Sequence, residues 1–363
     1  MKTVYALSIA VTLCWLPSGC AFDVQAGPQD VYVITNLGSS EDRRYGLELR
    51  SIPTVTTSPL QTEHFSFRSG FGHSDDLALT SPFRPSFDSE SDGLFPLDYP
   101  TLVAFTAAYH FELAYSYYET LGLGEIVEAP NNPYPVLIHS RVGLAPVGPF
   151  ALFISDNAGF LPGGKNPGFF IFPNHRFAGA KIPMAASQFI LTHEVGHAMF
   201  SLLQPDLSGP GVNALNEGLA DVFAFGATLD FHAFEDAIPE PYVTALAFRD
   251  PRTRQVWSLE TEITAYEGHR YPLGSVLVSS LYSYVEKTSP HTDDQHVRMH
   301  AVARMAFHAL ASWRPELLAS TDVHPIDFVN HLVRTLPSDE DVTLLCESMR
   351  EHWGELAEGL EGC

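Results

Sequence analysis

Two histidines one helical turn apart, His193 and His197, place the strongest constraint on this chain. They belong to His193-Glu-Val-Gly-His197, within a stretch of helix length (residues 185–203) that is mostly apolar and contains no proline. Because an α-helix repeats every 3.6 residues, the two imidazoles share one face and can bind one zinc ion together. Glu194, beside the first histidine, can then activate the zinc-bound water as a general base. The stretch therefore predicts a helix that carries a catalytic metal site.

The third zinc ligand must come from elsewhere, because a catalytic zinc has three protein ligands and one open position. A histidine at the position used by the metzincins is absent, since that position is Leu203. A glutamate on a following helix is the better candidate. Glu217 and Asp221 are four residues apart and share one helical face. Glu217 can bind zinc, while Asp221 can accept the ring N–H of a ligand histidine and fix its tautomer.

This pattern resembles the thermolysin-like zinc peptidases, the gluzincins, in which HExxH is followed at similar distance by N-E-x-x-x-D. The chain matches that motif with His193, Glu194 and His197, then Asn216, Glu217 and Asp221. The resemblance covers about residues 99–285. It includes an aromatic helix at 108–118 and, at Asn157 and Ala158, the edge strand that pairs with substrate backbone. It implies zinc-dependent cleavage of peptide bonds, most simply inside a chain, by an enzyme that binds a peptide or protein substrate.

Two residues compete for one further role that the resemblance implies. Gluzincins stabilise the tetrahedral oxyanion with a histidine, or in the aminopeptidase branch with the tyrosine of a Y-x-x-G sequence. The stretch Tyr266-Glu-Gly-His-Arg-Tyr-Pro-Leu-Gly274 offers His269, the thermolysin-type choice, and Tyr271, which fits Y-x-x-G. Arg249 resembles the family's arginine for the substrate carbonyl, although the gap that follows it is shortened.

The order of local patterns predicts an α+β, thermolysin-like fold. We expect a β-rich N-terminal domain and a mainly helical C-terminal domain, with the active-site helix at their junction. The expected segments are a signal peptide at 1–20, a strand-rich and loop-rich extension at 21–95, an N-terminal catalytic subdomain at 96–203 and a helical one at 204–363. Strands are expected near 31–35, 45–49, 64–67, 134–139, 151–155 and 169–172, a loop or linker at 81–92, and helices at 101–121, 215–225, 242–248, 273–287, 294–313, 326–335 and 339–360.

Composition and cysteine positions bear on location and partners. The formal net charge of −23 disfavours a nucleic-acid surface, which requires clustered Lys and Arg. Leu16-Pro-Ser-Gly-Cys20, after an apolar stretch, resembles a bacterial lipoprotein signal with a lipidated Cys20. We therefore expect an exported protein, anchored at the cell envelope or freely secreted. Cys346 and Cys363 either form one disulfide or remain thiols.

Two other functions fit parts of the pattern. An aminopeptidase would need an acidic exopeptidase motif on the edge strand, and none lies near Asn157. A lipid-anchored binding module without activity would not require Glu194. A second histidine group, made of His291, His296 and His300, lacks an adjacent glutamate and is expected to be a solvated helix face. No acidic loop of EF-hand type occurs, so the sequence predicts nothing about calcium.

Overall fold

A computed structural model describes residues 27–363 with short gaps. The gaps are 38–42, 74–75, 81–82, 89, 91–92, 128–131, 139–140, 148–149, 155–157, 164–165, 174, 239–245, 290, 316–322, 337 and 361–362. The expected signal peptide with Cys20, the edge-strand residue Asn157 and most of the helix expected at 242–248 therefore lie outside the described residues.

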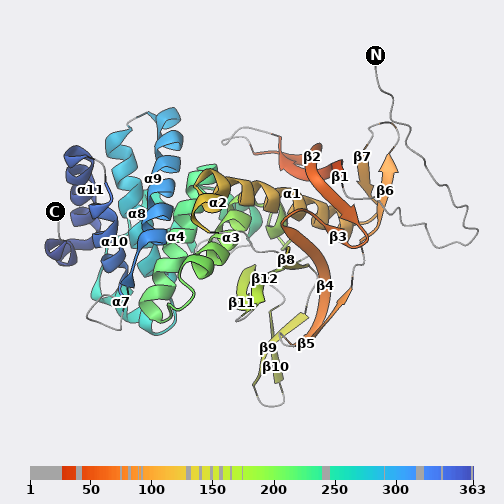
Figure 1. Ribbon diagram of the computed structural model, residues 1–363, viewed down its shortest axis with the longest axis horizontal. Helices are drawn as coiled ribbons and strands as arrows, with labels where there is room; N and C mark the ends of the chain where they lie inside the picture. Colours follow the sequence, from red (N-terminus) through yellow and green to blue (C-terminus); the bar gives the residue numbers. More distant parts are fainter. Residues whose placement is uncertain are drawn as a thin grey trace, which may run out of the picture.

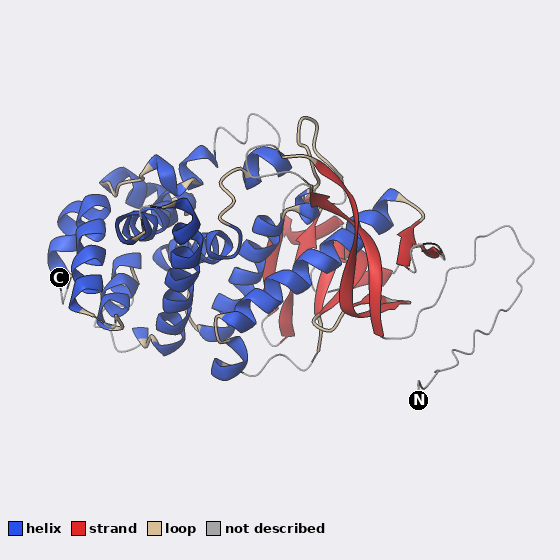
Figure 2. Ribbon diagram, turned by 90° about the horizontal axis from the view of Figure 1, so that it is seen from above, coloured by secondary structure: helices blue, strands red, loops and turns tan. Residues whose placement is uncertain are grey.

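Strands gather at one end of the molecule and most later helices at the other, as Figure 1 shows and Figure 2 shows from above. The strands are β1 Gly27–Asn36, β2 Tyr45–Thr57, β3 Leu60–Gln61, β4 Phe65–His73, β5 Asp76–Thr80, β6 Pro85–Asp88, β7 Gly93–Pro96, β8 Tyr134–Ile138, β9 Arg141–Val147, β10 Phe150–Ile154, β11 Gly159–Gly163 and β12 Asn166–Phe172. The helices are α1 Tyr99–Thr120, α2 Leu123–Ile126, α3 Gln188–Leu203, α4 Pro210–Thr228, α5 Ala233–Ala237, α7 Leu259–Tyr266, α8 Tyr271–Thr288, α9 Thr292–Ser312, α10 Pro325–Arg334 and α11 Asp339–Trp353. The protein thus combines a sheet and a helical half, as the α+β prediction requires.

One mixed sheet joins the early strands to the later ones. Its main order is β11-β12-β8-β4-β3-β2-β1-β7-β6. In addition, β5 and β9 pair with β4, and β10 pairs with β9. β4 pairs in parallel with β8, and β8 pairs in parallel with β12. The boundary expected at residue 95 therefore does not separate two sheets, because strands from both sides of it are neighbours. β11 lies at one edge of the sheet and against α3.

The prediction of a loop or linker at 81–92 is wrong in part. Residues 85–88 form β6, which pairs antiparallel with β7. Proline and serine make this stretch look like a linker, but an edge strand tolerates proline because one row of its N–H groups needs no partner. Pairing with β7, a contact that local patterning does not reveal, decides the outcome.

Aromatic side chains hold α1 against the sheet. The Phe111 ring lies 4.7 Å from the ring of Phe65 on β4 and 5.0 Å from that of Phe170 on β12. The helix begins at Asp98, whose carboxylate accepts the N–H of Thr101 at 2.8 Å. Aromatic pairs of this kind contribute about 1 kcal/mol each beyond the area they bury. The aromatic stripe predicted for this helix is therefore core.

Helix α3 crosses the middle of the molecule, between α1 and α4 (Figure 1). Ser187 caps its first turn by accepting the N–H of Ile190. Gly196 allows close approach to α4, since an added Cβ would lie 2.8 Å from the Tyr118 hydroxyl and 3.0 Å from the Cα of Ala220. The glycine inside the HExxH stretch therefore sets the spacing between the two helices that carry the candidate ligands.

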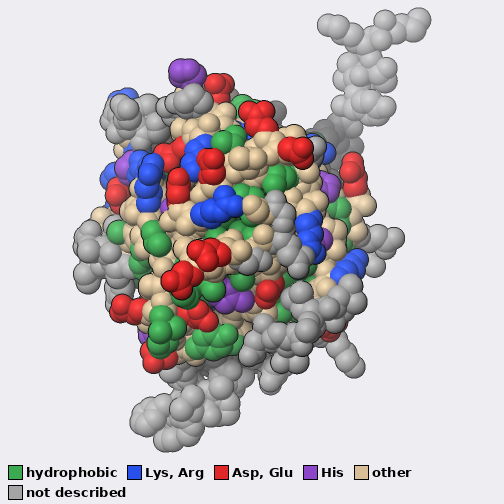
Figure 3. Space-filling model, turned by 90° about the vertical axis from the view of Figure 1, so that its left-hand side faces the viewer, with side chains coloured by type: hydrophobic (Ala, Val, Ile, Leu, Met, Phe, Trp, Pro, Cys, Tyr) green, Lys and Arg blue, Asp and Glu red, His purple; other side chains and the backbone are tan. Residues whose placement is uncertain are grey.

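The helical end carries two further features. Cys346 on α11 and Cys363 form a disulfide, which settles the pairing left open by the sequence. On the face shown in Figure 3, acidic and basic side chains are interspersed, and the basic ones do not join into a continuous patch. Within the described part of the chain, no helix combines the length and the apolar character needed to cross a membrane.

Candidate metal centre

Three side chains from α3 and α4 converge at the centre of the molecule. Nε2 of His193 lies 3.0 Å from Nε2 of His197, and Oε2 of Glu217 lies 3.3 and 3.6 Å from these two atoms. Oε2 of Glu217 is buried and has no hydrogen-bond donor among the described residues. Two imidazole nitrogens and a carboxylate oxygen gathered in this way can hold a metal ion.

Each histidine is oriented by a partner on α4. Nδ1 of His193 lies 2.9 Å from Oδ1 of Asp221, and Nδ1 of His197 lies 2.9 Å from Oδ1 of Asn216. These contacts place the ring N–H on Nδ1 and turn Nε2 of both rings toward Glu217. Asp221 thus contacts the ring of a candidate ligand histidine, which is the contact predicted for it, and Asn216 contacts the other histidine.

Arg249 contacts Asp221, the residue that orients His193, and is buried, with 7% of its side chain exposed. Its Nε and Nη2 donate to the two carboxylate oxygens of Asp221 at 3.0 and 2.6 Å. The guanidinium also lies over the ring of Tyr271, 5.0 Å from its centroid. Its Nη2 atom also lies 3.2 Å from Nδ1 of His193, so the side chain is held within the site. The substrate contact predicted for Arg249 stays a prediction.

Helix α8 brings two more side chains to the group. Nε of Arg270 donates to Oε1 of Glu217 at 2.6 Å, so the oxygen that faces the histidines is the other one. The Tyr271 ring lies 5.0 Å from the guanidinium carbon of Arg249 and 5.5 Å from that of Arg270. Burial raises the pKa of the Tyr271 phenol, and the charge of Glu217 raises it further, so the hydroxyl keeps its proton.

The charges of the group depend on one another. Burial and Arg249 act to lower the pKa of His193, but Asp221 and Glu217 raise it to about 9. Burial acts to raise the pKa of Glu217, but the two histidines hold it well below its usual range. Burial acts in the same way on Asp221, whose pKa Arg249 and His193 lower. Both carboxylates therefore stay ionised and can neutralise a bound cation.

Glu194 follows His193 on α3 and is not one of the three candidate ligands. Only 7% of the residue is exposed, and its Oε2 is a buried oxygen with no hydrogen-bond partner in the described part of the chain. Leaving a buried carboxylate oxygen unpaired is costly. A hydrogen bond from a bound ligand or from a reacting water molecule to this oxygen would offset the cost.

The remaining predicted residues lie at different distances from the group. His269 is exposed in the turn between α7 and α8, where its backbone N–H donates to the Thr264 carbonyl at 2.8 Å. Tyr271, in contrast, is mostly buried against Arg249 and is affected by the charge of Glu217. Ala158 is buried directly before edge strand β11. The group of His193, His197 and Glu217 is the one set of metal-binding character among the described residues, so His291, His296 and His300 do not form a second one.

Sequence reasoning missed the role of Arg270. It stands beside Tyr271 in the stretch that was singled out, but its spacing matches no motif. Sequence reasoning also gave no role to Gly218, the residue after the candidate ligand Glu217. A Cβ at Gly218 would lie 2.7 Å from the carbonyl oxygen of Gly274, so α4 and α8 touch backbone to backbone beside Glu217. Glycine next to a predicted ligand was the signal that could have indicated this contact.

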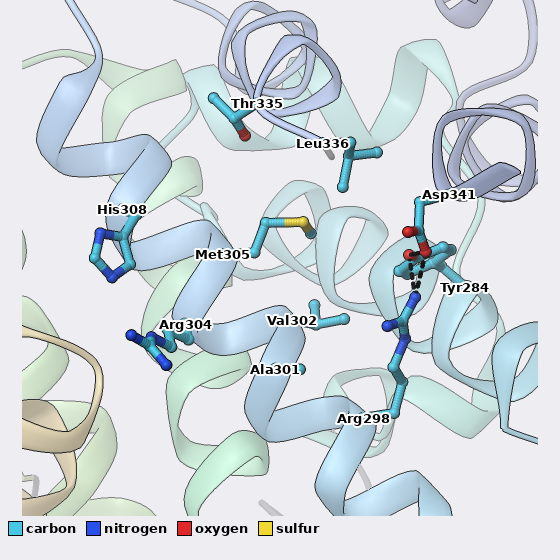
Figure 4. Close-up of a pocket in the computed structure, with 10 residues that line it drawn as sticks. All are labelled: Tyr284, Arg298, Ala301, Val302, Arg304, Met305, His308, Thr335, Leu336 and Asp341. Carbon is cyan, nitrogen blue, oxygen red and sulfur yellow. Dashed lines mark hydrogen bonds and ion pairs between the residues drawn. The ribbon is translucent and has the colours of Figure 1, made fainter. Parts of the chain in front are cut away.

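A separate pocket opens between α8, α9 and α11, with a volume of about 490 Å³. It shares no residue with the metal group. Figure 4 shows apolar side chains, among them Met305, in its middle, and the dashed contacts of Arg298 with Asp341 and Tyr284 at one side. The polar groups on that side bind one another, which leaves Arg304 and His308 on the other side.

In comparisons with known proteins, no protein-family model matches this chain and no curated protein matches it. The chemistry of the site is therefore the basis for assigning a function.

Proposed function

We propose that this protein is a zinc-dependent metallopeptidase of thermolysin-like architecture that cleaves bonds inside peptide chains. One observation carries the proposal. Two histidines and a glutamate converge, each is held by a second polar group, and the residue after His193 is Glu194, which is buried with one unpaired oxygen. An inert scaffold would gain nothing from keeping this carboxylate buried and unpaired.

The donor set fits zinc. Zinc favours imidazole nitrogen and carboxylate oxygen in a three-ligand site that leaves one position open. His193, His197 and Glu217 would hold the ion. When bound, the ion supplies Lewis-acid polarisation of the substrate carbonyl and lowers the pKa of water toward neutrality.

The protein's own groups perform the proton transfers. Glu194 accepts a proton from the attacking water and passes it to the nitrogen of the leaving amine. Tyr271, which keeps its phenolic proton, donates a hydrogen bond to the oxygen that develops negative charge. Within this proposal Tyr271 is preferred to His269, because His269 is exposed whereas Tyr271 lies against Arg249 and is affected by the charge of Glu217.

Substrate would bind as an added strand. β11 is the edge strand nearest to α3, and Ala158 precedes it directly. Main-chain groups of an edge strand pair with an extended peptide whatever its side chains are. Asn157 and Arg249 stay predictions for this surface. We further propose that the protein acts outside the cytoplasm, lipid-anchored through Cys20 or secreted.

Metal content and hydrolysis test the proposal together. Purified protein should bind about one zinc ion per chain. A random peptide library read by mass spectrometry, with and without chelator, should show chelator-sensitive cleavage at internal bonds. Glu194→Gln should abolish cleavage and keep zinc, whereas Glu260→Gln, at an exposed position on α7, should change neither.

Each alternative predicts a different result. Release of single N-terminal residues would indicate the aminopeptidase. Zinc binding with no cleavage of any library member would indicate the inert binding module. Protein that binds no zinc after native folding would overturn the metal site itself.

A further inference from the structure

Arg270 is the exposed charged group of the metal centre. Its side chain is 44% exposed, whereas those of His193, His197 and Glu217 are 7%, 13% and 5% exposed. It is the residue directly before α8 and contacts the ligand Glu217 through Nε. Arg270 therefore stands at the rim, between solvent and the place where a substrate would react.

Two neighbours hold the guanidinium of Arg270, and further N–H donors remain for a ligand. A guanidinium carries five N–H donors in a planar fork, and the bond to Glu217 uses the one on Nε. The Tyr271 hydroxyl is a second hydrogen-bond partner of the guanidinium, and no carboxylate other than Glu217 is recorded against it among the described residues. The Tyr271 ring, 5.5 Å from the guanidinium carbon, supports its orientation. A pre-oriented pair of donors is suited to bidentate binding of a carboxylate.

The charge balance points to the same ligand. Three carboxylates belong to this part of the chain: Glu217 is a candidate ligand, Asp221 contacts His193, and Glu194 follows His193 in the sequence. Buried Arg249 and a divalent ion neutralise them, so Arg270 adds one positive charge in excess. This excess stands out in a chain whose formal net charge is −23. It attracts an anionic group and repels a cationic one.

We propose that Arg270 binds a carboxylate of the peptide substrate, so that this protein prefers peptides with a carboxylate close to the cleaved bond. The inference rests on the proposed peptidase function and names its substrate class. Because Arg270 touches a metal ligand, the carboxylate that it binds belongs to a residue next to the cleaved bond or one further along. A free C-terminus and an Asp or Glu side chain both supply this chemistry. A free α-ammonium group at that place is disfavoured, which argues against the aminopeptidase.

A second role for Arg270 must be kept apart from this one. Its Nε holds Oε1 of Glu217 and leaves Oε2 for the ion, so its loss also disturbs the ligand. Such a positioning effect changes zinc affinity and lowers the cleavage of every peptide by the same factor. It does not change the ratio between peptides with and without a carboxylate.

The test compares peptides of one sequence in three forms. The first has both ends capped, the second has a free C-terminal carboxylate, and the third is capped and carries one glutamate moved from position to position. Wild-type protein should cleave the best carboxylate-bearing form roughly 10- to 100-fold more efficiently, mainly through KM. The second and third forms show which source of carboxylate is recognised.

Variants assign this preference to the residue. Arg270→Gln should abolish the preference, and Arg270→Lys should retain part of it because the charge remains. Arg254→Gln, which removes the same charge at a side chain that is 69% exposed, should leave the preference intact. An unchanged preference in Arg270→Gln would overturn the proposal, as would an equal loss for all three forms.

A binding measurement separates this inference from the peptidase proposal. Fluorescence anisotropy of the same labelled peptides with Glu194→Gln protein requires no turnover. If the wild type cleaves nothing, the peptidase proposal fails, and the binding data still decide the role of Arg270. Tighter binding of carboxylate-bearing peptides that disappears in Glu194→Gln/Arg270→Gln supports it, and equal binding of all forms contradicts it.

Discussion

Gly218 on α4 faces Gly274 on α8 so closely that a methyl group on Gly218 would lie 2.7 Å from the Gly274 carbonyl oxygen. The residue before Gly218 is the ligand Glu217, and one turn before Gly274 is Arg270, which binds that ligand. Both helices accept a residue of low helix propensity at this point. The close approach sets the distance between the metal group and the side chains of the α8 N-terminus.

Gly274→Ala should therefore disturb the site as well as the fold. The new Cβ would lie 2.7 Å from the Ala214 carbonyl oxygen and 2.9 Å from the Gly218 nitrogen. Overpacking of this kind costs about 1–3 kcal/mol, although alanine by itself favours the helix. The unfolding temperature and the zinc affinity should both decrease. Gly124→Ala, where an added Cβ meets nothing within 4 Å, is the matched control and should be neutral or stabilising.

Asp221→Asn should weaken metal binding without removing a ligand. The change takes away the charge that orients His193 and pairs with Arg249. Loss of such a partner lowers metal affinity by roughly 10- to 100-fold, measured by competition with a chelator. Asp250→Asn also breaks an aspartate–arginine pair, with Arg252, but contacts no ligand. Equal zinc affinity of the two variants would remove Asp221 from the metal site.

His110 should make stability depend on pH. Burial lowers its pKa from 6.5 to about 4, so the unfolded chain takes up the proton first as pH falls. The stability that depends on neutral His110 is therefore complete above pH 6.5 and is lost as pH falls toward 4. The loss is roughly 3 kcal/mol. In urea titrations, His110→Gln should lose less stability than wild type across this range, and parallel curves would contradict the assignment.

Cys363→Ser should destabilise the C-terminal helix and, with it, the helical half. The disulfide links residues 17 positions apart and holds the last residue against α11. Cross-links of such loops contribute about 3 kcal/mol, mainly by restricting the unfolded chain. Cys346 is buried and remains in place in this variant. Wild type with the disulfide reduced should show the same decrease in unfolding temperature, and the variant should be insensitive to reductant.

Local sequence patterns were sufficient to predict which side chains share one face of a helix. His193 and His197 share a face because of the 3.6-residue period, and Glu217 and Asp221 do so for the same reason. The structure brings the first three together and places Asp221 on His193, as predicted. The aromatic helix 99–120 is core because its rings recur at helical spacing.

Other features depended on contacts between distant parts of the chain. The choice between His269 and Tyr271 depends on the direction in which α8 leaves the turn after α7, which the glycine contact with α4 helps to set. The parallel pairing of β4 with β8 joins residues far apart in sequence. No local period reports such pairings.

The sequence by itself therefore determined the donor set of the candidate site, since ligand type and helical spacing are local properties. Tertiary structure alone decided which further groups stand beside it. Packing of α8 on α4 brings Tyr271 and Arg270 to the ligands and leaves His269 in solvent. The physical reason is that the type of each side chain is a local property of the sequence. The distance between two packed helices depends instead on contacts between residues of both helices, which are far apart in the chain.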